Sequence, residues 1–329
     1  MPALIKLTEN ERRFIVCACL NANRSAKEIG DSLGIREHTV RHIKQSLISR
    51  GILQPLYKID TYRIGYTDFR VFLSDVAEPT NVRLDFERRA VHHEKVYWMA
   101  RMTGAFKYAL TFLAKDPCEM IDFFGEVQPP NNGFFANRTI AIAGEWTIFS
   151  PNFLAPQIKS RDSITLSARE RLDVRLDETD ERILMTIARN PGGSLASVAR
   201  AAGMKTSSLQ YRVEKLSEMN VIRGQTYLLN CERLGIQIYR IMIIERTLSP
   251  EQRQQLREYV CCHPNVSAFL VSTGGWDYEL RFEAESSETL ENFCQSIIDR
   301  FGSAIASIRT SQQVSTLKRV SYPVPQPVG

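Results

Sequence analysis

The pattern of apolar and polar positions is most regular between residues 276 and 285, where the two kinds of side chain alternate at every step. The apolar set is Trp276, Tyr278, Leu280, Phe282 and Ala284, and the polar set is Asp277, Glu279, Arg281, Glu283 and Glu285. Because successive side chains of a strand point to opposite faces, this stretch predicts a half-buried strand with one solvent-exposed face. The Gly274-Gly275 pair before it predicts a tight turn out of the apolar run 266–271.

The same arrangement occurs earlier in the chain, at residues 103–114. Its apolar positions each lie 170 residues upstream of those above, at Phe106, Tyr108, Leu110, Phe112 and Ala114. Five matches at one offset, together with a shared Thr-Gly before them, indicate a tandem duplication. The alternation alone does not decide whether these aromatic rows face packed helices or a partner sheet.

Helical spacing of apolar residues predicts three helices at the start of the chain, at 7–21, from Ser25 and at 36–47. Thr8, followed three residues later by Glu11, has the capping-box signature of a helix start.

Gly34 ends the second of these helices, and residues 52–59 after the third predict a small β-ribbon. Three helices with a glycine turn between the second and third, followed by a β wing, predict a winged helix-turn-helix domain. A second such domain starts at Leu176 and aligns with the first at an offset of 169, and one inserted residue in its wing restores the offset of 170.

Each of these domains is followed by a pattern that predicts a βαββαβ unit. The first has strands at 69–73, 96–102, 106–114 and 138–149, with helices at 82–92 and after Pro117; the second has a strand at 239–244 and helices at 250–262 and 287–301. The predicted fold class is therefore α+β, with two winged helix-turn-helix domains, each followed by a ferredoxin-like βαββαβ domain. The predicted boundaries are 1–66, 67–150, a linker at 151–175, 176–236, 237–320 and a disordered tail at 321–329.

Composition and charge exclude only a few classes of protein. The 329 residues exceed what one core usually holds, and the net charge of +5 permits a polyanionic partner without demanding one. The seven cysteines show no C-x-x-C spacing, which disfavours a disulfide framework or a zinc site and favours a reducing compartment. With no signal-peptide pattern and no apolar run of membrane-spanning length, we expect a cytoplasmic protein without a membrane, metal or cofactor partner.

Positive charge gathers on the predicted third helix and wing of the first domain, because residues 36–58 hold five basic residues against one acid, Glu37. Solvated charges on a small helical domain would explain this too, but motif and charge together favour double-stranded DNA as the partner. The residues expected at phosphates are Arg36, Arg41, Lys44, Lys58, Lys205, Arg212 and Lys215. Those expected at base edges or nearby backbone are His38, Thr39, His42, Gln45, Ser207, Ser208, Gln210 and Tyr211.

Several motifs, in this order and spacing, resemble the Lrp/AsnC (feast/famine) family of transcriptional regulators. They are Leu176-Asp-Glu-Thr-Asp-Glu-Arg-Ile-Leu184, the helix-turn-helix, Leu229-Asn-x-x-x-Leu-Gly235 and Thr273-Gly-Gly-Trp-Asp-Tyr278. The resemblance covers nearly the whole chain, twice. It implies a winged helix-turn-helix before a βαββαβ effector (RAM) domain, with the sheets of two units paired face to face so that two heads read DNA.

The resemblance also implies an oligomer and an effector. The sheets would pair within one chain, or in a homodimer or higher homo-oligomer. A small-molecule effector, often an amino acid, would bind near Thr273, Gly274 and Asp277, although a plain hairpin turn explains these three residues equally well.

Family members usually carry one unit per chain, whereas this chain carries two, and Lys107 in the first stands where the second has Asp277. The loop at 128–133 also departs from the family pattern. These differences leave open whether the first copy senses a ligand or reads the same DNA sequence.

The alternative is an enzyme, because siroheme decarboxylases share this two-domain plan. In those enzymes the pattern His-Asn-Tyr-x-Arg stands where the chain enters the hairpin. At the corresponding places this chain has His92-His-Glu-Lys-Val-Tyr97 and His263-Pro-Asn-Val-Ser267, which do not match. His92, His93 and Glu94 would suit a metal, although adjacent histidines at a helix end are more often only exposed. No ionisable pair recurs in both copies in a way that suggests acid–base chemistry, so we expect a regulator with no catalytic residues.

Overall fold

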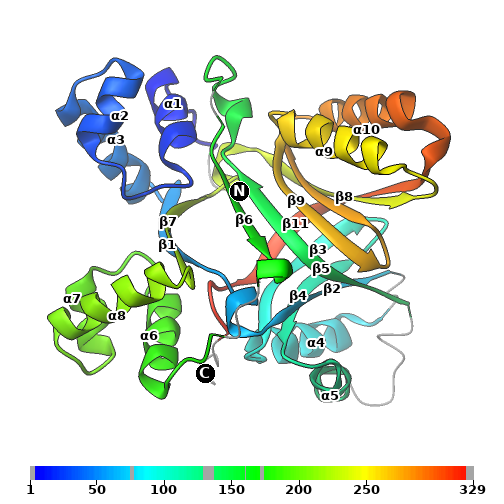
Figure 1. Cartoon of the computed structure of the whole chain (residues 1–329). Helices are drawn as coiled ribbons and strands as arrows, with labels where there is room; N and C mark the ends of the chain where they lie inside the picture. Colours follow the sequence, from blue (N-terminus) through cyan, green and yellow to red (C-terminus); the bar gives the residue numbers. More distant parts are fainter. Residues whose placement is uncertain (1–3, 75–77, 129–136, 160, 171–173, 324–329) are drawn as a thin grey trace.

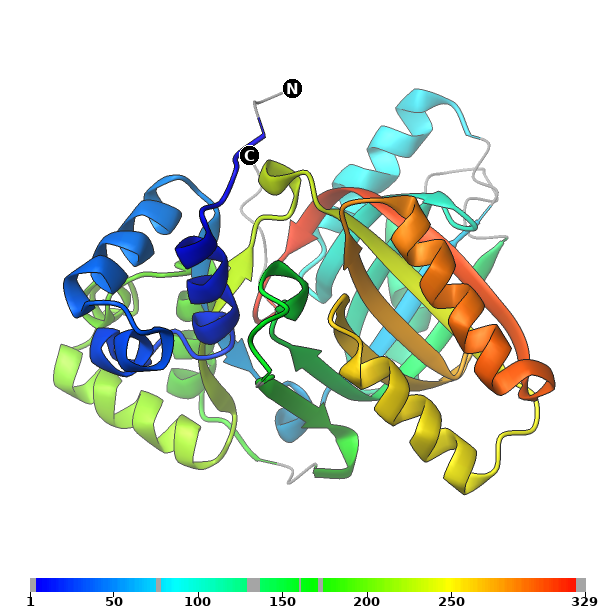
Figure 2. The ribbon, with the colours of Figure 1, turned by 90° about the horizontal axis from the view of Figure 1, so that it is seen from above.

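Two three-helix heads and two βαββαβ units follow one another along the chain. The computed structural model describes residues 4–74, 78–128, 137–159, 161–170 and 174–323. The first head comprises α1 (Glu9–Ala18), α2 (Ala26–Leu33), α3 (Glu37–Ser49) and β1 (Leu53–Ile59), and the second α6 (Glu178–Arg189), α7 (Leu195–Ala201), α8 (Thr206–Glu218) and β7 (Ile222–Leu229). The heads lie on one side of the molecule and the sheet with its helices on the other (Figures 1 and 2).

The helices of the heads begin and end where local chemistry places them. Thr8 and Ser25 both form capping boxes, in which the hydroxyl accepts from the backbone three residues on and a glutamate reaches back. Gly34 ends α2 with a φ of 68°, in the left-handed region that glycine enters without a steric penalty.

The wing of each head is not the local ribbon that the sequence predicts. β1 is a single strand, and it pairs in antiparallel fashion with β7 of the other head, with Leu53 opposite Leu229. The expectation of a ribbon within residues 52–59 is therefore wrong. The inserted residue of the second copy forms a bulge, since the register shifts after Tyr57 and Gly224 there has a φ of 101°.

The two βαββαβ units close into one barrel. Its strands are β2 (Thr67–Leu73), β3 (Val96–Gly104), β4 (Tyr108–Ala114) and β5 (Arg138–Phe149), then β8 (Gln237–Glu245), β9 (Val266–Gly274), β10 (Tyr278–Ala284) and β11 (Ile305–Arg319). The order is β2-β4-β3-β11-β8-β10-β9-β5, and β5 pairs again with β2. The last strand of each unit thus pairs with the other unit, so of the two pairings expected for the sheets, the one within a single chain is present.

Four helices cover the outside of this barrel, as Figure 2 shows for the second unit. They are α4 (Thr80–His92) and α5 (Pro117–Val127) on the first unit, and α9 (Pro250–Cys262) and α10 (Ser287–Phe301) on the second. The aromatic rows pack under them: Tyr108 and Phe112 lie in the core with Phe86 and Phe123, and Tyr278 and Phe282 pack in the corresponding core of the second unit. Phe106 and Trp276, the first residue of each row, pack instead against Phe72 in a separate cluster. The rest of each row therefore faces the helices, which decides what alternation left open.

The opposite strand face, predicted to be solvent-exposed, lies inside the barrel. Glu279 is 0% exposed and Glu283 is buried, so the expectation of a solvated polar face is wrong for the middle of this strand. Burial is tolerated because the charges pair: Arg70 of β2 donates from Nε and Nη2 to the two Glu279 oxygens at 3.0 and 2.5 Å. This bidentate pair joins the first unit to the second.

Residues outside the repeats also belong to the fold. β6 (Ser163–Ser167), inside the predicted linker, pairs with the end of β5 and extends the sheet. Tyr322, inside the predicted disordered tail, is buried in the core of the second head, which corrects that expectation; 324–329 lie outside the described residues. The predicted loop at 128–133 also falls outside them after Gln128. None of the described helices is long and apolar enough to cross a membrane.

The buried pair predicts a large stability difference between two acid-to-amide substitutions. Glu279→Gln leaves Arg70 without its bidentate carboxylate in a site closed to water, so we expect unfolding in urea to show a loss of about 3–5 kcal/mol. Asp85→Asn, which removes a carboxylate paired with Arg88 and Arg89 at the surface, should cost less than about 1 kcal/mol. Equal losses would contradict the interior role of Glu279.

Candidate DNA-binding surface and interior cavity

The helix α3 presents most of the residues expected to touch DNA. Its buried stripe is Val40, Ile43 and Leu47, which fixes the helix on the head. Arg36, His38, Arg41, His42 and Gln45 are exposed, whereas Thr39 and Lys44 are partly buried. Of these, His38, His42 and Gln45 share one helical face, away from the buried stripe. Arg41 is engaged by Glu37 one turn earlier in an exposed ion pair.

The helix α8 presents the corresponding surface of the second head. Lys205, Ser207, Ser208, Gln210, Tyr211 and Lys215 are exposed, with Tyr211 at 68%. Arg212 is different, because its Nη1 lies 2.7 Å from both Asp177 Oδ2 and Asp180 Oδ1 of α6. That double pairing neutralises the Arg212 charge, so the expectation that it contacts phosphate is not favoured by the geometry.

Neither of these helices has a side-chain cap, because the side chains of Arg36 and Lys205 occupy the capping positions and accept no hydrogen bond from the first turn. The Thr39 N–H donates to the backbone carbonyl of Arg36 at 2.9 Å, so the earlier N–H groups of α3, and those at the start of α8, are the ones open to an anion beside a basic residue.

The two heads differ in charge along the exposed face. Glu214 and Glu218 of α8 stand at the positions of Gln45 and Ser49 in α3, at the offset of 169. The first head therefore offers the more positive surface to a polyanion.

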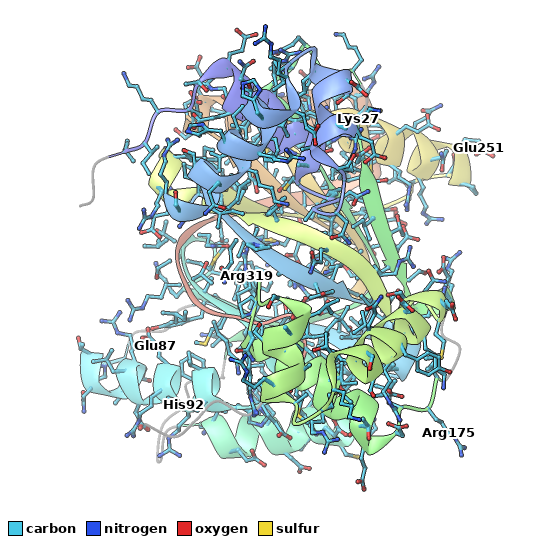
Figure 3. The ribbon with its side chains drawn as sticks, turned by 90° about the vertical axis from the view of Figure 1, so that its left-hand side faces the viewer. Lys27, Glu87, His92, Arg175, Glu251 and Arg319 are labelled. Atoms are coloured by element: carbon cyan, nitrogen blue, oxygen red, sulfur yellow. The ribbon has the colours of Figure 1, made fainter. Side chains whose placement is uncertain are left out.

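A groove of about 860 Å³ lies between α3 and α8 and brings part of the predicted set together. Arg41 and Lys44 line it from the first head, and Gln210 from the second, with the β1–β7 ribbon between them. Figure 3 shows the heads above and below this ribbon. The ribbon thus sets the position of one head relative to the other.

Lys58 was expected to contact a DNA phosphate, but its side chain lies inside the molecule. It is 5% exposed, and its Nζ lies 3.5 Å from the centre of the Trp146 ring. Its strand, β1, pairs with the other head and turns this side chain towards the barrel, which is the physical reason that the expectation fails.

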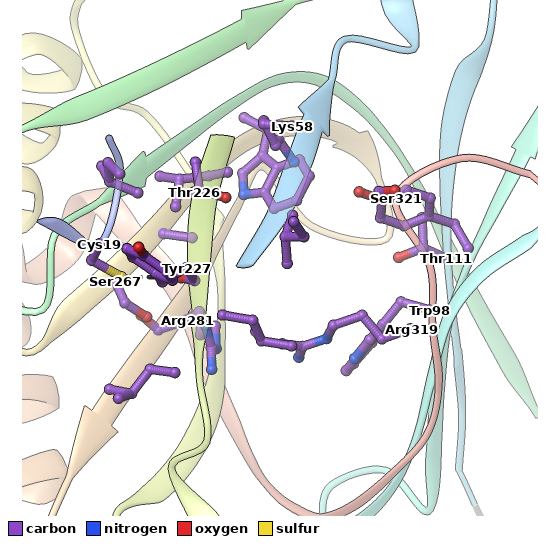
Figure 4. A pocket seen from close by; sticks show the side chains of 18 of the residues that line it. Cys19, Lys58, Trp98, Thr111, Thr226, Tyr227, Ser267, Arg281, Arg319 and Ser321 are labelled. Carbon is purple, nitrogen blue, oxygen red and sulfur yellow. Dashed lines mark hydrogen bonds between the residues drawn. The ribbon is translucent and has the colours of Figure 1, made fainter. Parts of the chain in front are cut away.

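Lys58 lines a cavity of about 210 Å³ between the ribbon and the barrel (Figure 4). Strands from both units contribute to it, as do the ribbon and the end of β11. The charged residues that line it are Lys58, Asp68, Arg70, Arg240, Arg281, Glu283 and Arg319. Trp98 and Trp146 supply aromatic walls, and Leu56 and Leu228 supply apolar surface from the ribbon.

Burial shifts the titration of these groups. It lowers the pKa of Lys58 to about 7, against the opposing effect of Asp60 and Asp68, and raises the pKa of Asp68 to about 6. Burial, together with the nearby cations Arg70, Arg281 and Arg319, lowers the pKa of Arg240, while Glu279 opposes this. A guanidinium nonetheless stays protonated, so the cavity keeps its positive charges.

This cavity was not predicted from the sequence, although the sequence contains a signal for it. Arg70 and Arg240 lie at the repeat offset of 170, each inside an otherwise apolar strand, Phe69-Arg-Val and Tyr239-Arg-Ile. A charge kept in both copies of a buried strand points to a paired or ligand-binding role rather than to solvent.

The three residues expected near an effector lie at the turn between β9 and β10. Thr273 and Gly274 pair with Ile142 and Ala141 of β5, so the turn is packed against the first unit. A Cβ on Gly274 would lie 2.8 Å from the Ile140 carbonyl oxygen, and the Asp277 carboxylate accepts from the Glu245 backbone at 2.8 Å. Hairpin geometry and close packing therefore account for Gly274 and Asp277 without a ligand.

The histidine cluster considered for a metal is not assembled. His93 lies 3.2 Å from Glu126 and packs against Phe123, whereas the His92 ring contacts the Arg88 carbonyl. Within the described part of the chain, no group of three or more His, Cys, Asp or Glu residues is arranged to hold a metal ion.

Comparison with known proteins gives the same architecture. A family model described as winged helix-turn-helix DNA-binding matches residues 176–223. The transcriptional regulator AzlB of Bacillus subtilis is 30% identical over 159 residues, which are 46% of this chain and 98% of AzlB. LrpC of the same organism is 24% identical over 120 residues, 36% of this chain and 82% of LrpC.

A likeness over the full length is found with a solved structure of the siroheme decarboxylase NirDL, at a TM-score of 0.60 and 10% identity. It covers 97% of this chain and 94% of that one, which shows the shared two-unit fold and nothing of the chemistry. Almost the whole of AzlB matches a stretch of this chain as long as one of its two units. The chain belongs to the Lrp/AsnC family, as a tandem of two of its winged helix-turn-helix and RAM units.

Proposed function

We propose that this protein is a sequence-specific, DNA-binding transcriptional regulator in which one chain supplies both reading heads. The observation that carries the proposal is that α3 and α8 both present exposed polar faces and uncapped N-termini, on heads joined by the β1–β7 ribbon. Phosphate contacts from the helix starts and from Arg41 and Lys44 would set the register. His38, His42 and Gln45, and Ser207 and Tyr211 on the other head, would read bases in the major groove.

The two heads would contribute unequally to DNA affinity. Arg212 is held by two carboxylates, and Glu214 and Glu218 repel phosphate, whereas the equivalent positions of α3 carry no acid. Most of the phosphate attraction would therefore come from the first head. The two heads also present different side chains to the bases, so the preferred site would be asymmetric.

A second candidate function is that of a tetrapyrrole-modifying enzyme, favoured by the full-length likeness to NirDL, whose structure is also known with an iron-uroporphyrin III analogue. Two features disfavour it. The cavity of about 210 Å³ is smaller than the range of roughly 300–1,000 Å³ typical of sites for drug-sized ligands, and a tetrapyrrole needs more. Among the described residues that line it there is no histidine. We propose that the chain is not an enzyme.

Charge-neutralising variants of the two helices test the proposal. With DNA fragments recovered from genome-wide binding, Arg41→Gln/Lys44→Gln should weaken binding by roughly tenfold to a hundredfold. It should also make the slope of log affinity against log salt less negative by about 2, because two phosphate contacts are lost. Lys205→Gln/Lys215→Gln should have the same sign but a smaller effect. Fluorescence anisotropy at several salt concentrations measures both quantities.

Arg88→Gln is the control for net charge, because Arg88 is exposed on α4, away from the heads. Its binding should match that of the parent chain. A complex whose affinity does not change with salt, or equal losses in all three variants, would rule out binding through the heads. Loss in only the first double variant would show that a single head reads DNA.

The enzyme candidate has its own test. We expect iron-uroporphyrin III added to the protein to keep the visible absorbance spectrum that it has in buffer, because the cavity is too small to admit it. A saturable shift of its Soret band at micromolar ligand, absent for a denatured sample, would support the enzyme and contradict our proposal.

A further inference from the structure

The cavity between the ribbon and the barrel is not used by the proposed DNA contacts, and its charge is unbalanced. The cations are Lys58, Arg70, Arg240, Arg281 and Arg319, and the acids on or directly behind the wall are Asp68, Glu279 and Glu283. Glu279 serves both Arg70 and Arg240, at 2.5 and 3.4 Å, and Glu283 pairs with Arg281 at 2.9 Å. A surplus of positive charge therefore remains among side chains that are mostly buried.

Several polar groups on this wall have no hydrogen-bond partner within the described part of the chain. They are Nε of Arg240 and Arg281, Oδ1 of Asp68, and the indole N–H groups of Trp98 and Trp146. Arg240 is 6% exposed and Asp68 is 5% exposed. Unpaired buried polar atoms are uncommon in folded proteins because each one loses its hydration without compensation. All five belong to side chains that line one cavity, and four of them are donors, so a molecule that mostly accepts hydrogen bonds would suit this wall.

The size and the walls of the cavity limit what that molecule is. A volume of about 210 Å³ equals the share of roughly seven liquid waters, which exceeds a simple inorganic anion and falls short of a nucleotide. Trp98 and Trp146, with Leu56, Leu228 and Leu270, give the wall an apolar part as well as a charged part. The occupant therefore has a small carbon skeleton beside its anionic group.

We propose that this cavity binds a small organic carboxylate of net negative charge, with its carboxylate at Arg240, Arg281 and Arg319 and a hydroxyl or other donor at Asp68. The guanidinium groups match a carboxylate in geometry, because their planar N–H groups meet two oxygens at once. Figure 4 places Arg281 and Arg319 in one part of the cavity and Lys58 in another, so the anion can be held from both sides.

The position of the cavity makes the occupant an effector, and this part rests on the proposed function. Lys58 and Leu56 of β1, with Thr226 and Leu228 of β7, form its wall on the ribbon side, and these strands connect the two heads. A ligand that contacts both ribbon and barrel fixes their separation, and thereby the spacing of α3 and α8. Such a ligand shifts DNA affinity only if it binds the two head positions unequally.

Binding is tested first without DNA, on the full chain. The probes are malate, 2-oxoglutarate, lactate and benzoate, with malamide and benzamide as neutral counterparts, leucine and phenylalanine as zwitterions, and inorganic phosphate. At least one carboxylate should raise the Tm by roughly 2–4 °C at saturation and change tryptophan fluorescence. Only three tryptophans occur in the chain, and Trp98 and Trp146 line the cavity, so Trp98→Phe or Trp146→Phe should reduce the fluorescence change.

Variants assign the site. Arg319→Gln, at a half-buried position, should weaken binding at least tenfold, and Arg240→Gln should weaken it further. Arg101→Gln is the matched control: Arg101 also lies on a barrel strand but pairs with Glu87 under α4, outside the cavity, and should bind as the parent does. A response only to phosphate, an equal response to the amides, tighter binding of zwitterions than of net anions, or no response at all would each overturn the proposal.

The buried lysine predicts a pH dependence of carboxylate affinity that a merely structural role of Lys58 would not produce. The ammonium of Lys58 faces Asp60 at the end of its strand, Asp68 of β2, Arg319 of β11 and Trp146 of β5. Burial lowers its pKa to about 7, so the charge is present below pH 7 and lost above it. Carboxylate affinity should fall as pH rises from 6.5 to 8.5, by up to about tenfold per unit. Lys58→Met should remove that fall and should melt no lower than the parent chain at pH 7, because a buried charge is gone.

Coupling to DNA is measured last, with the carboxylate that binds. We expect a change of at least threefold in DNA affinity at saturating ligand, lost in Arg319→Gln. If the ligand binds and DNA affinity does not change, the effector role is contradicted, whereas the binding site remains supported. If DNA binding itself is absent, the proposed function fails, and the binding data without DNA still decide the site.

Discussion

The interior charge of the barrel is the constraint on which the rest of this molecule depends. From Tyr108 and Tyr278 onward, the aromatic rows of β4 and β10 face outward to α4, α5, α9 and α10, so the other face of each strand lies inside the barrel. The barrel interior carries Arg70, Arg240 and Glu279, which can be buried only as partners. The pairing ties the first copy to the second, and the duplicated chain therefore folds as one closed body with two heads outside it.

Local structure could be predicted from the sequence because its signals are local. The helices at 250–262 and 287–301 have the predicted ends, since capping residues and apolar spacing lie within each segment. Pairing between distant segments could not be predicted in the same way. A strand has the same alternating pattern whether its charged face contacts water or other charged side chains, so the burial of Glu279 could not be predicted from the pattern. Lys58 was misplaced for a related reason, because its surroundings depend on β7, more than 160 residues away.

Duplication within one chain permits differences that a pair of identical chains cannot have. At the position of Ile43, which packs in the core of the first head, the second head has Arg212, which is paired with Asp177 and Asp180. Thr111 and Arg281 are likewise equivalent by the repeat offset, and only one of them brings a charge to the cavity. Each copy therefore carries its own side chains at equivalent positions, with the closed barrel as the shared requirement.

The bulge at Gly224 carries this asymmetry into the ribbon itself. One extra residue in β7 has no counterpart in β1, and next to it Arg223 lies within 3.7 Å of Asp60, which directly follows β1. The ribbon consequently has distinguishable halves, and rotation by half a turn does not superpose the molecule on itself. A duplex bound by such a molecule acquires a direction: its two ends are no longer equivalent, and reversing the site relative to a neighbouring start of transcription is a different arrangement.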